Sequence, residues 1–312
     1  MINFRFHLVS LTAVFLALCI GIAVGAAVVD QATVDFLETR LKGVEARLDS
    51  TDSQNTQLRA QLQRWDAFAE QSRDDTLAGR LAGVPVLVLA TRGMDRRPID
   101  DFRQSLAAAG ATLTGTVWFT SKLQLGKVED AAALAELLGV DPAGADPVRR
   151  SMVNLLSAEL AGQSQSSGLL GRLRDGAFVE VESPAGTAVD PTAPPPAGTL
   201  FVVASDAGAV VANELLAQPL ASQLAQTARG RVLAVEPGHD ADGPRRPARR
   251  ALFVGPLRAD NQVSPLLSTV DDLEDVRGRF AAVYALRDLG AGKVGHYGVG
   301  PGATRLVPEA TG

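Results

Sequence analysis

Side chains suited to metal or thiol chemistry are few in this chain. Cys19 is its only cysteine, and its histidines are His7, His239 and His296. A single cysteine excludes an intrachain disulfide and excludes metal sites built from cysteine clusters. Soft transition-metal ions favour paired cysteine or methionine ligands, and the sequence shows no such pair. The sequence therefore leaves the identity of any metal ligand unknown.

Two weak candidates for a metal ligand remain, Cys19 and His239. His239 stands beside Asp240 and Asp242, a combination that suits Cu(II) or Zn(II). The surrounding stretch is rich in Pro and Gly, which is more typical of a solvated turn. Cys19 lies in a long apolar run, where we expect it to contact lipid or to pack against a neighbour.

A second group of polar side chains lies near the C-terminus. Loops that follow the strands of a parallel sheet often form binding sites. Asp271, Asp272, His296 and Tyr297 are therefore candidates to line a pocket in the α/β domain predicted below. The alternatives are structural, with Asp272 capping a helix and the His-Tyr pair packing against the domain.

Common motifs of enzyme chemistry are mostly absent from the sequence. The stretch GAGKVGHYGVGPGA has the glycines and lysine of a phosphate-binding loop, but Lys293 precedes Val294 where such loops carry Ser or Thr. The stretch also follows a predicted helix and opens none, so it is no dinucleotide fingerprint. No GxSxG or HExxH sequence occurs. We predict that the protein is not an enzyme, and no cofactor is evident.

A membrane anchor is predicted near the N-terminus. Residues 8–29 carry no charge, and as a helix they extend about 33 Å, enough to cross a hydrocarbon core of about 30 Å. Arg5 precedes this segment, whereas Asp30, Asp35 and Glu38 follow it. The positive-inside rule therefore places residues 1–7 in the cytoplasm and the rest outside the membrane. The alternative is a cleaved signal peptide, although no clear A-x-A cleavage site follows.

Small residues recur every four positions within the anchor. Ala13, Ala17, Gly21 and Gly25 form one stripe, which includes a GxxxG sequence. Such a stripe lets two membrane helices approach closely, so these residues are predicted to pack a pair of anchors. The alternative is that Ala and Gly are simply common in this chain.

Residues 30–76 are predicted to form a coiled-coil stalk. Apolar residues alternate in steps of three and four, and an asparagine at one core position favours a two-stranded register. The predicted homodimer is parallel, because charges flanking this seam would pair between parallel copies. The alternative is a lone amphipathic helix that lies on its own domain. The seam residues are Val34, Leu37, Leu41, Val44, Leu48, Asn55, Leu58 and Leu62.

Residues 77–312 are predicted to form an extracytoplasmic α/β domain. Short apolar runs such as 84–90 and 200–204 indicate buried strands, and helical patterns such as 99–109 and 211–228 alternate with them. A last helix is predicted at 276–289. This alternation predicts a mainly parallel sheet covered by helices. Two inserts, 183–198 and 237–250, are predicted to be surface loops. The net charge of −5 gives no sign of nucleic-acid binding.

The chain resembles a known family nearly from end to end. The resemblance rests on the start INFRFHLVSLTAVFLALCIGIAVG, the predicted coiled coil, and the ending LLSTVDDLEDVRGRFAAVYALRDLGAGKVGHYGVGPGA. It is most specific in STVDD (268–272), ALRDL (285–289) and GHYGVG (295–300). These stretches resemble the actinobacterial copper transporter family, the MctB-like group, which also contains the SteB cell-division proteins.

The resemblance implies two different roles. The family name implies copper homeostasis or transport, and copper is the one metal that it suggests. The SteB members imply a dimeric, membrane-anchored scaffold that regulates cell division or peptidoglycan hydrolysis through a cell-wall hydrolase or division partner. One spanning helix cannot enclose a pore, and the predicted strands are short buried runs unlike those of a membrane barrel. Transport through a single copy is therefore not expected.

Overall fold

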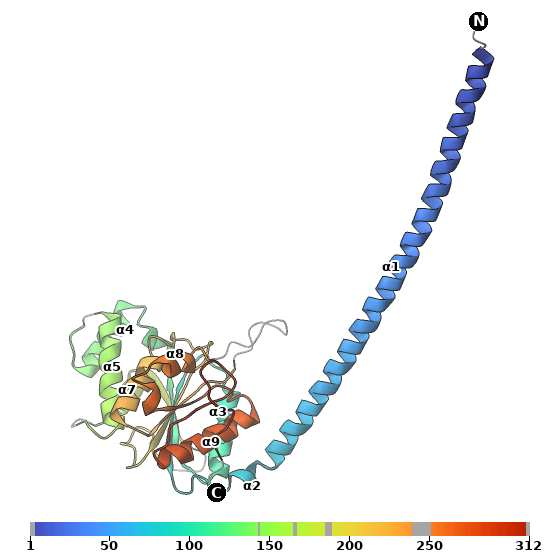
Figure 1. Cartoon of the computed structure of the whole chain (residues 1–312). Helices are drawn as coiled ribbons and strands as arrows, with labels where there is room; N and C mark the ends of the chain where they lie inside the picture. Colours follow the sequence, from blue (N-terminus) through green and yellow to red (C-terminus); the bar gives the residue numbers. More distant parts are fainter. Residues whose placement is uncertain (1–3, 143, 165–166, 185–188, 239–250, 310–312) are drawn as a thin grey trace. The chain divides into compact units, whose positions relative to one another are not determined.

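The computed structural model describes residues 4–142, 144–164, 167–184, 189–238 and 251–309. Contacts divide the chain into two compact units, Met1–Trp65 and Asp66–Gly312, each described here by itself. Helix α1 (Phe4–Gln71) forms the first unit and extends into the second (Figure 1). The predicted anchor and most of the predicted stalk therefore belong to one continuous helix of 68 residues.

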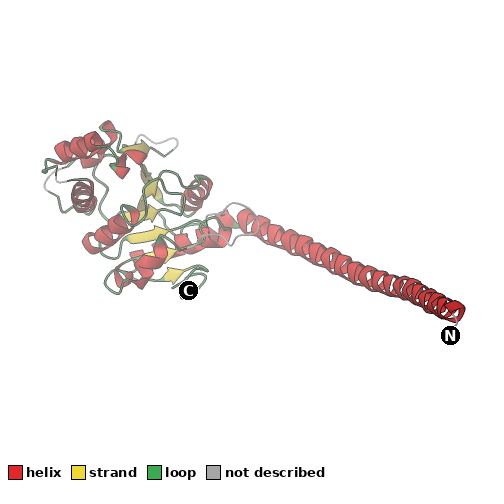
Figure 2. Ribbon diagram, turned by 90° about the horizontal axis from the view of Figure 1, so that it is seen from above, coloured by secondary structure: helices red, strands yellow, loops and turns green. Residues whose placement is uncertain are grey.

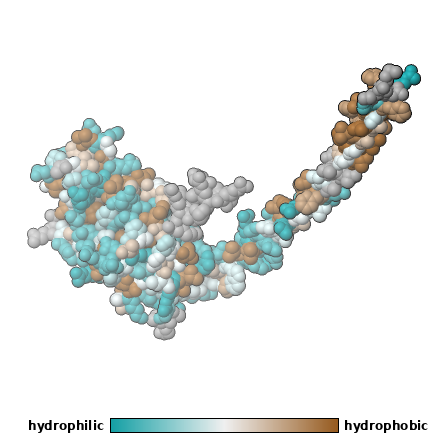
Figure 3. Space-filling model, turned by 45° about the horizontal axis from the view of Figure 1, so that its top comes forward, coloured by the Kyte–Doolittle hydropathy of each residue, from teal (hydrophilic) through white to brown (hydrophobic). Residues whose placement is uncertain are grey.

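The first part of α1 is long and apolar enough to cross a membrane. Residues Phe4–Ala26 have a mean hydropathy of 2.5, and none of them is buried by the rest of the chain. Figure 3 shows this apolar surface in brown. The side chains of residues 27–32, which include Asp30, lie outside the described ones. The helix continues past them without proline, since none occurs in this range.

The second unit is built on a seven-stranded sheet in the order β3-β2-β1-β4-β5-β6-β7. All neighbouring strands are parallel except β3, which pairs with β2 in the antiparallel direction at one edge. The predicted, mainly parallel α/β fold is confirmed. The strands are β1 (Pro85–Thr91), β2 (Thr112–Phe119), β3 (Val179–Glu182), β4 (Leu200–Ala204), β5 (Val232–Val235), β6 (Ser268–Val270) and β7 (His296–Tyr297).

Helices cover both faces of this sheet (Figure 2). One face packs against α2 (Arg73–Leu77), α3 (Arg97–Ala108) and α9 (Val276–Gly290). The helices and 3₁₀ turns with apolar residues in the core of the other face are η1 (Ser121–Gln124), α4 (Val128–Leu138), α5 (Ala145–Leu160), α6 (Leu169–Asp175), α7 (Ala217–Thr227), α8 (Val254–Ala259) and η2 (Ser264–Leu266).

The two cores explain why the central strands are apolar at every position. In β1, Val86 and Val88 pack in the core with α3 and α9, whereas Leu87 and Leu89 pack in the opposite core. Successive strand residues point to opposite faces, so a strand covered on both sides needs an uninterrupted apolar run. This is why the apolar runs predicted β1 and β4 correctly.

The proline-rich insert at 183–198 packs partly against the sheet. A Cβ added to Gly115 in β2 would lie 2.4 Å from side-chain atoms of Pro191, and Gly115 has a φ of +151°. A bulge in the β1–β2 pairing leaves Thr114 as the extra residue beside this glycine. Glycine is needed here because the loop comes so close to the backbone. Residues 185–188, and residues 239–250 of the other predicted insert, lie outside the described ones.

Candidate functional site

Asp271 lies directly after β6 and is completely buried. Its Oδ2 lies 2.5 Å from Nη1 of Arg258 and accepts a 2.9 Å hydrogen bond from the amide of Gly300. Its Oδ1 accepts a 2.8 Å hydrogen bond from the amide of Val299. Both oxygens of this carboxylate therefore accept from protein donors, as a buried charge requires.

Arg258, from α8, ties together the strands and the glycine-rich stretch. Its Nε donates to Oγ1 of Thr269 at 2.7 Å, and its Nη2 donates to the carbonyl of Tyr297 at 2.7 Å. Its Nη1 also donates to the carbonyl of Pro301 at 3.0 Å. The guanidinium therefore joins α8, β6, β7 and the loop after β7 through one planar group with several donors.

Glycine is required where the GHYGVG stretch wraps around Asp271. Gly298 has a φ of +123°, and a Cβ there would lie 2.1 Å from Oδ1 of Asp271. A Cβ on Gly300 would lie 2.7 Å from Oδ2 of the same carboxylate. The STVDD and GHYGVG segments therefore contact each other. The buried aspartate of the first needs the backbone amides of the second, and the close approach of that aspartate needs the glycines of the second.

Asp272 is buried beside the start of α9, but it is not the cap of that helix. The cap is Asp275, whose side chain accepts a 2.9 Å hydrogen bond from the amide of Arg277. The carbonyl of Asp272 accepts from the amide of Asp275 at 3.0 Å, and a Cβ on Gly278 would lie 1.9 Å from that carbonyl oxygen. Asp272 therefore shapes the turn into α9.

The two predicted aromatic pocket residues have different surroundings. His296 is half-buried between Oγ of Ser264, 2.7 Å from its Nε2, and Oγ1 of Thr269, 3.1 Å from its Nδ1. Burial and the nearby Arg258 charge lower the pKa of His296 below its usual value. Tyr297 is mostly buried, and burial raises the pKa of its hydroxyl. Of the four predicted residues, Tyr297 lines a cavity, one of about 420 Å³.

Glu236, which the sequence did not single out, is a completely buried carboxylate directly after β5. It accepts hydrogen bonds of 2.8, 2.8 and 2.9 Å from the amides of Leu252, Phe253 and Val254. Burial raises the pKa of Glu236 to about 7, and the charge of Asp271 adds to the shift. The sequence held one signal for this buried carboxylate, namely an acidic residue at the end of an otherwise apolar strand.

The weak metal candidates do not come together in the described structure. Cys19 is exposed on the apolar part of α1, and His239 lies outside the described residues. Among the residues that the structure describes, no group of three or more His, Cys, Asp or Glu side chains is arranged to hold a metal ion.

The residues of the predicted dimer seam are exposed along α1. The exposed fractions of its apolar side chains lie between 51% for Val34 and 62% for Leu41. The remaining members, Leu37, Val44, Leu48, Asn55, Leu58 and Leu62, are also exposed. In the small-residue stripe, a Cβ on Gly21 or Gly25 would meet nothing within 4 Å. Ala13 and Ala17 are exposed on the same helix.

Comparison with known proteins identifies the family. A family model described as "Copper transport outer membrane protein, MctB" matches residues 1–308. The chain belongs to the MctB family. The "Copper transporter MctB" of Mycobacterium tuberculosis H37Rv is 29% identical over 335 residues, covering 98% of this chain and 99% of that protein. The "Copper transporter MctB" of Mycobacterium leprae is 26% identical over 337 residues, covering 99% and 100%.

The predicted resemblance to the MctB family is thus confirmed over almost the whole chain. The match runs through the apolar part of α1 and through the α/β unit alike. Neither the matched family nor these relatives carries a cell-division name, so the SteB-like alternative receives no support from them. Within this MctB-family fold, the two most specific C-terminal segments are those joined by Asp271.

Proposed function

We propose that this protein takes part in copper transport or copper homeostasis as a single-pass protein of the cell membrane. The observation that carries the proposal is the match of the MctB copper-transport family over residues 1–308. That match includes the one described helix long and apolar enough to cross a membrane. One family model therefore covers both the anchor and the α/β unit, so the proposed function applies to the two parts together.

The proposed orientation has residues 1–7 in the cytoplasm and the α/β unit outside the membrane. Arg5 precedes the apolar segment, and Asp35 and Glu38 follow it. The test places single cysteines at His7 or at the exposed Lys127 in a Cys19→Ala background. In spheroplasts, a membrane-impermeant maleimide should label Lys127→Cys, whereas His7→Cys should react only after lysis. Labelling of His7→Cys in unlysed spheroplasts would reverse the orientation.

The proposed unit of function is a parallel pair of chains. One helix cannot enclose a pore, because close-packed backbone atoms fill its interior and the side chains project outward. Transport therefore requires assembly of several chains or a partner protein. The exposed apolar seam of α1 supports pairing, since side chains such as Leu41 and Leu48 are more than half exposed in the single chain. Burial of such a stripe between two copies is the main driving force of a coiled coil.

Deletion of the gene tests the proposed function. We expect cells without the protein to accumulate more copper and to stop growing at copper concentrations that the parent tolerates. Metal content is measured by mass spectrometry of washed cells, with zinc as the control metal. The wild-type chain should restore both properties. Unchanged copper content together with unchanged copper tolerance would reject the proposed function.

Direct handling of copper is tested separately, by Cu(I) competition against a chromophoric chelator. The samples are the full chain in lipid nanodiscs and its Cys19→Ala variant. We expect the two to be indistinguishable, because Cys19 is exposed on an apolar helix without a second thiol in the chain. Tight stoichiometric binding that disappears in Cys19→Ala would instead make this thiol part of a copper pathway.

A further inference from the structure

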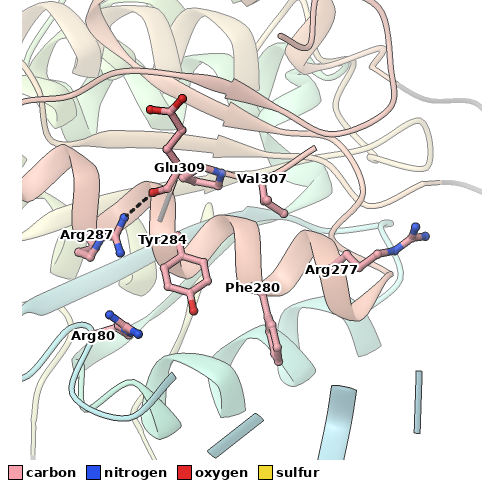
Figure 4. Close-up of a pocket in the computed structure, with 8 residues that line it drawn as sticks. Arg80, Arg277, Phe280, Tyr284, Arg287, Val307 and Glu309 are labelled. Carbon is pink, nitrogen blue, oxygen red and sulfur yellow. Dashed lines mark hydrogen bonds between the residues drawn. The ribbon is translucent and has the colours of Figure 1, made fainter. Parts of the chain in front are cut away.

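A cavity of about 340 Å³ lies along one face of α9 in the α/β unit (Figure 4). Phe280, Tyr284 and Arg287 point into it from successive turns of the helix. Positions three or four residues apart share one helix face, which is why these side chains form a continuous surface. Arg80 and Val307 complete the cavity from two other segments of the chain.

Two arginines stack beside the Tyr284 ring. The Cζ atom of Arg80 lies 5.6 Å from the ring centroid, and that of Arg287 lies 5.0 Å from it. These are cation–π distances, so the ring holds both guanidinium groups at the cavity. The hydroxyl of Tyr284 is held in turn, because it donates to the carbonyl of Thr76 at 3.4 Å.

Three arginines line the cavity, and they differ in how far their charge is already matched. Arg277 forms an ion pair with Asp275. Arg287 is positioned by Asp288, whose Oδ1 lies 2.9 Å from its Nε and 2.6 Å from its Nη2. Arg80 makes no ion pair with any described residue. The carboxylate of Glu309 forms an ion pair with Arg305, and Figure 4 shows it directed away from Tyr284. The cavity therefore presents positive charge that the described part of the chain does not neutralise.

The opposite wall of the cavity is apolar and comes from the last described residues. Val307 and Pro308 form this wall, across from Phe280. Two contacts hold this segment in place. The backbone of Arg305 forms an isolated β-bridge with that of Tyr297, and the carbonyl of Glu309 accepts a 3.3 Å hydrogen bond from Nη2 of Arg287. A partly open cavity of this size with a few convergent polar groups has the character of a small-molecule site.

We propose that this cavity binds a small organic anion, a carboxylate or phosphate attached to an apolar body. The guanidinium of Arg80, with that of Arg287 beside it, would bind the anionic group through charge-assisted hydrogen bonds, for which the planar fork of arginine is well suited. The apolar body would pack between Phe280 and Val307. This ligand is separate from copper, because guanidinium groups repel cations and the lining residues include no Cys, His or Met.

The test is calorimetric titration of the full chain, in phosphatidylcholine nanodiscs, with 3-phenylpropanoate and 3-phenylpropyl phosphate. Two control compounds separate the two parts of the site. 3-Phenylpropanol carries the apolar body without charge, and inorganic phosphate carries charge without the body. We expect both anions to bind with one site per chain and neither control compound to bind measurably.

Matched variants locate the binding. Arg80→Gln should weaken it about tenfold, the loss expected for one charge-assisted hydrogen bond. Tyr284→Leu removes the ring that positions both arginines and should weaken it at least as much. Arg229→Gln replaces an exposed arginine that follows α7, on the other side of the sheet, and should leave binding unchanged. Circular dichroism confirms that each variant is folded.

The outcomes distinguish the proposal from its alternatives. Equal binding of the uncharged alcohol would reject the anion site, as would equal losses in Arg80→Gln and Arg229→Gln. Absence of binding by both anions would also reject it. A third anion, soluble dihexanoyl phosphatidic acid, separates two sources of the same chemistry. Tighter binding than 3-phenylpropyl phosphate would assign the site to a lipid phosphate, and weaker binding would assign it to a free organic acid.

Discussion

The carboxylate of Asp271 and the guanidinium of Arg258 form an ion pair that is almost completely withdrawn from solvent, with Oδ2 and Nη1 2.5 Å apart. The two residues come from different elements, β6 with its following turn and α8. The amides of Val299 and Gly300 add two further donors to the same carboxylate. The pair is therefore the point at which three separate stretches of the chain meet.

Removal of one partner of this pair should be strongly destabilising. In Arg258→Met, Asp271 stays buried without its counter-ion, which typically costs about 3–5 kcal/mol. Urea unfolding of the full chain in a Trp65→Phe background measures this, because the buried Trp118 then reports on the α/β unit alone. Arg277→Met is the control, since that exposed arginine pairs with Asp275 at a site where loss costs under about 1 kcal/mol.

The double variant Arg258→Met with Asp271→Asn sharpens this test. It removes both charges, so it should be less destabilised than the sum of the two single variants. Simple additivity of the two effects would show that the ion pair contributes no coupling.

A single methyl group at Gly298 should be poorly tolerated. Gly298→Ala combines a φ of +123° with a Cβ only 2.1 Å from Oδ1 of Asp271. We expect a loss of about 2–5 kcal/mol from backbone strain and overpacking together. Gly290→Ala is the matched control, because a Cβ there meets nothing within 4 Å. Thermal unfolding compares them, and equal melting temperatures would contradict the close packing around Asp271.

The raised pKa of Glu236, about 7, makes stability depend on pH. Between the unfolded pKa near 4.5 and the folded value, the folded protein binds more protons than the unfolded chain. The contribution of Glu236 to the free energy of unfolding is therefore greatest at low pH, and it declines by roughly 3 kcal/mol as pH rises through this window. Urea unfolding at pH 5 and pH 8 measures the change.

Glu236→Gln isolates that effect from other titrating groups. The lowered pKa of His296 acts in the opposite direction, because the unfolded chain binds its proton more readily and stability then rises with pH. The His296 contribution is present in both proteins and cancels in the comparison. We expect the free energy of unfolding of the variant to fall much less between pH 5 and pH 8 than that of the wild-type protein. An unchanged decline would assign it to another group.

Cross-linking tests the proposed parallel dimer. In a Cys19→Ala background, Leu48→Cys should form a disulfide between two copies under mild oxidation, because a parallel pair places equal seam positions face to face. Ala46→Cys lies at an outer position of the heptad and should remain largely monomeric on a non-reducing gel. Equal cross-linking at both positions would point to random collision, and no cross-linking at Leu48→Cys would contradict the seam.

The larger elements of the fold could be predicted from the sequence because each carries a repeated signal. The continuous apolar runs at 84–90 and 200–204 identified strands covered on both faces, now β1 and β4. Helix α9 was predicted to within one residue by its pattern and its terminal glycine. Strands β6 and β7 were not predicted, because three and two residues are too short to show a period.

The arrangement around Asp271 could not be predicted for a different reason. Its partners Arg258 and Val299 lie 13 and 28 positions away along the chain, and no spacing rule connects them. The sequence showed that STVDD and GHYGVG were distinctive, but not that they contact each other. The cavity beside Tyr284 was missed as well, because Arg80 and Val307 reach α9 only through the tertiary fold.

The contacts between Asp271 and the GHYGVG stretch can form only late in biosynthesis, because translation runs from the N-terminus. Asp271 and Arg258 are synthesised before Val299 and Gly300, which complete their hydrogen bonding, and before Tyr297, which adds the last strand to the sheet. A nascent chain that ends before residue 295 therefore has an incomplete sheet edge and a poorly satisfied buried aspartate. We expect such a chain to remain a substrate for proteases until the final stretch has emerged and docked.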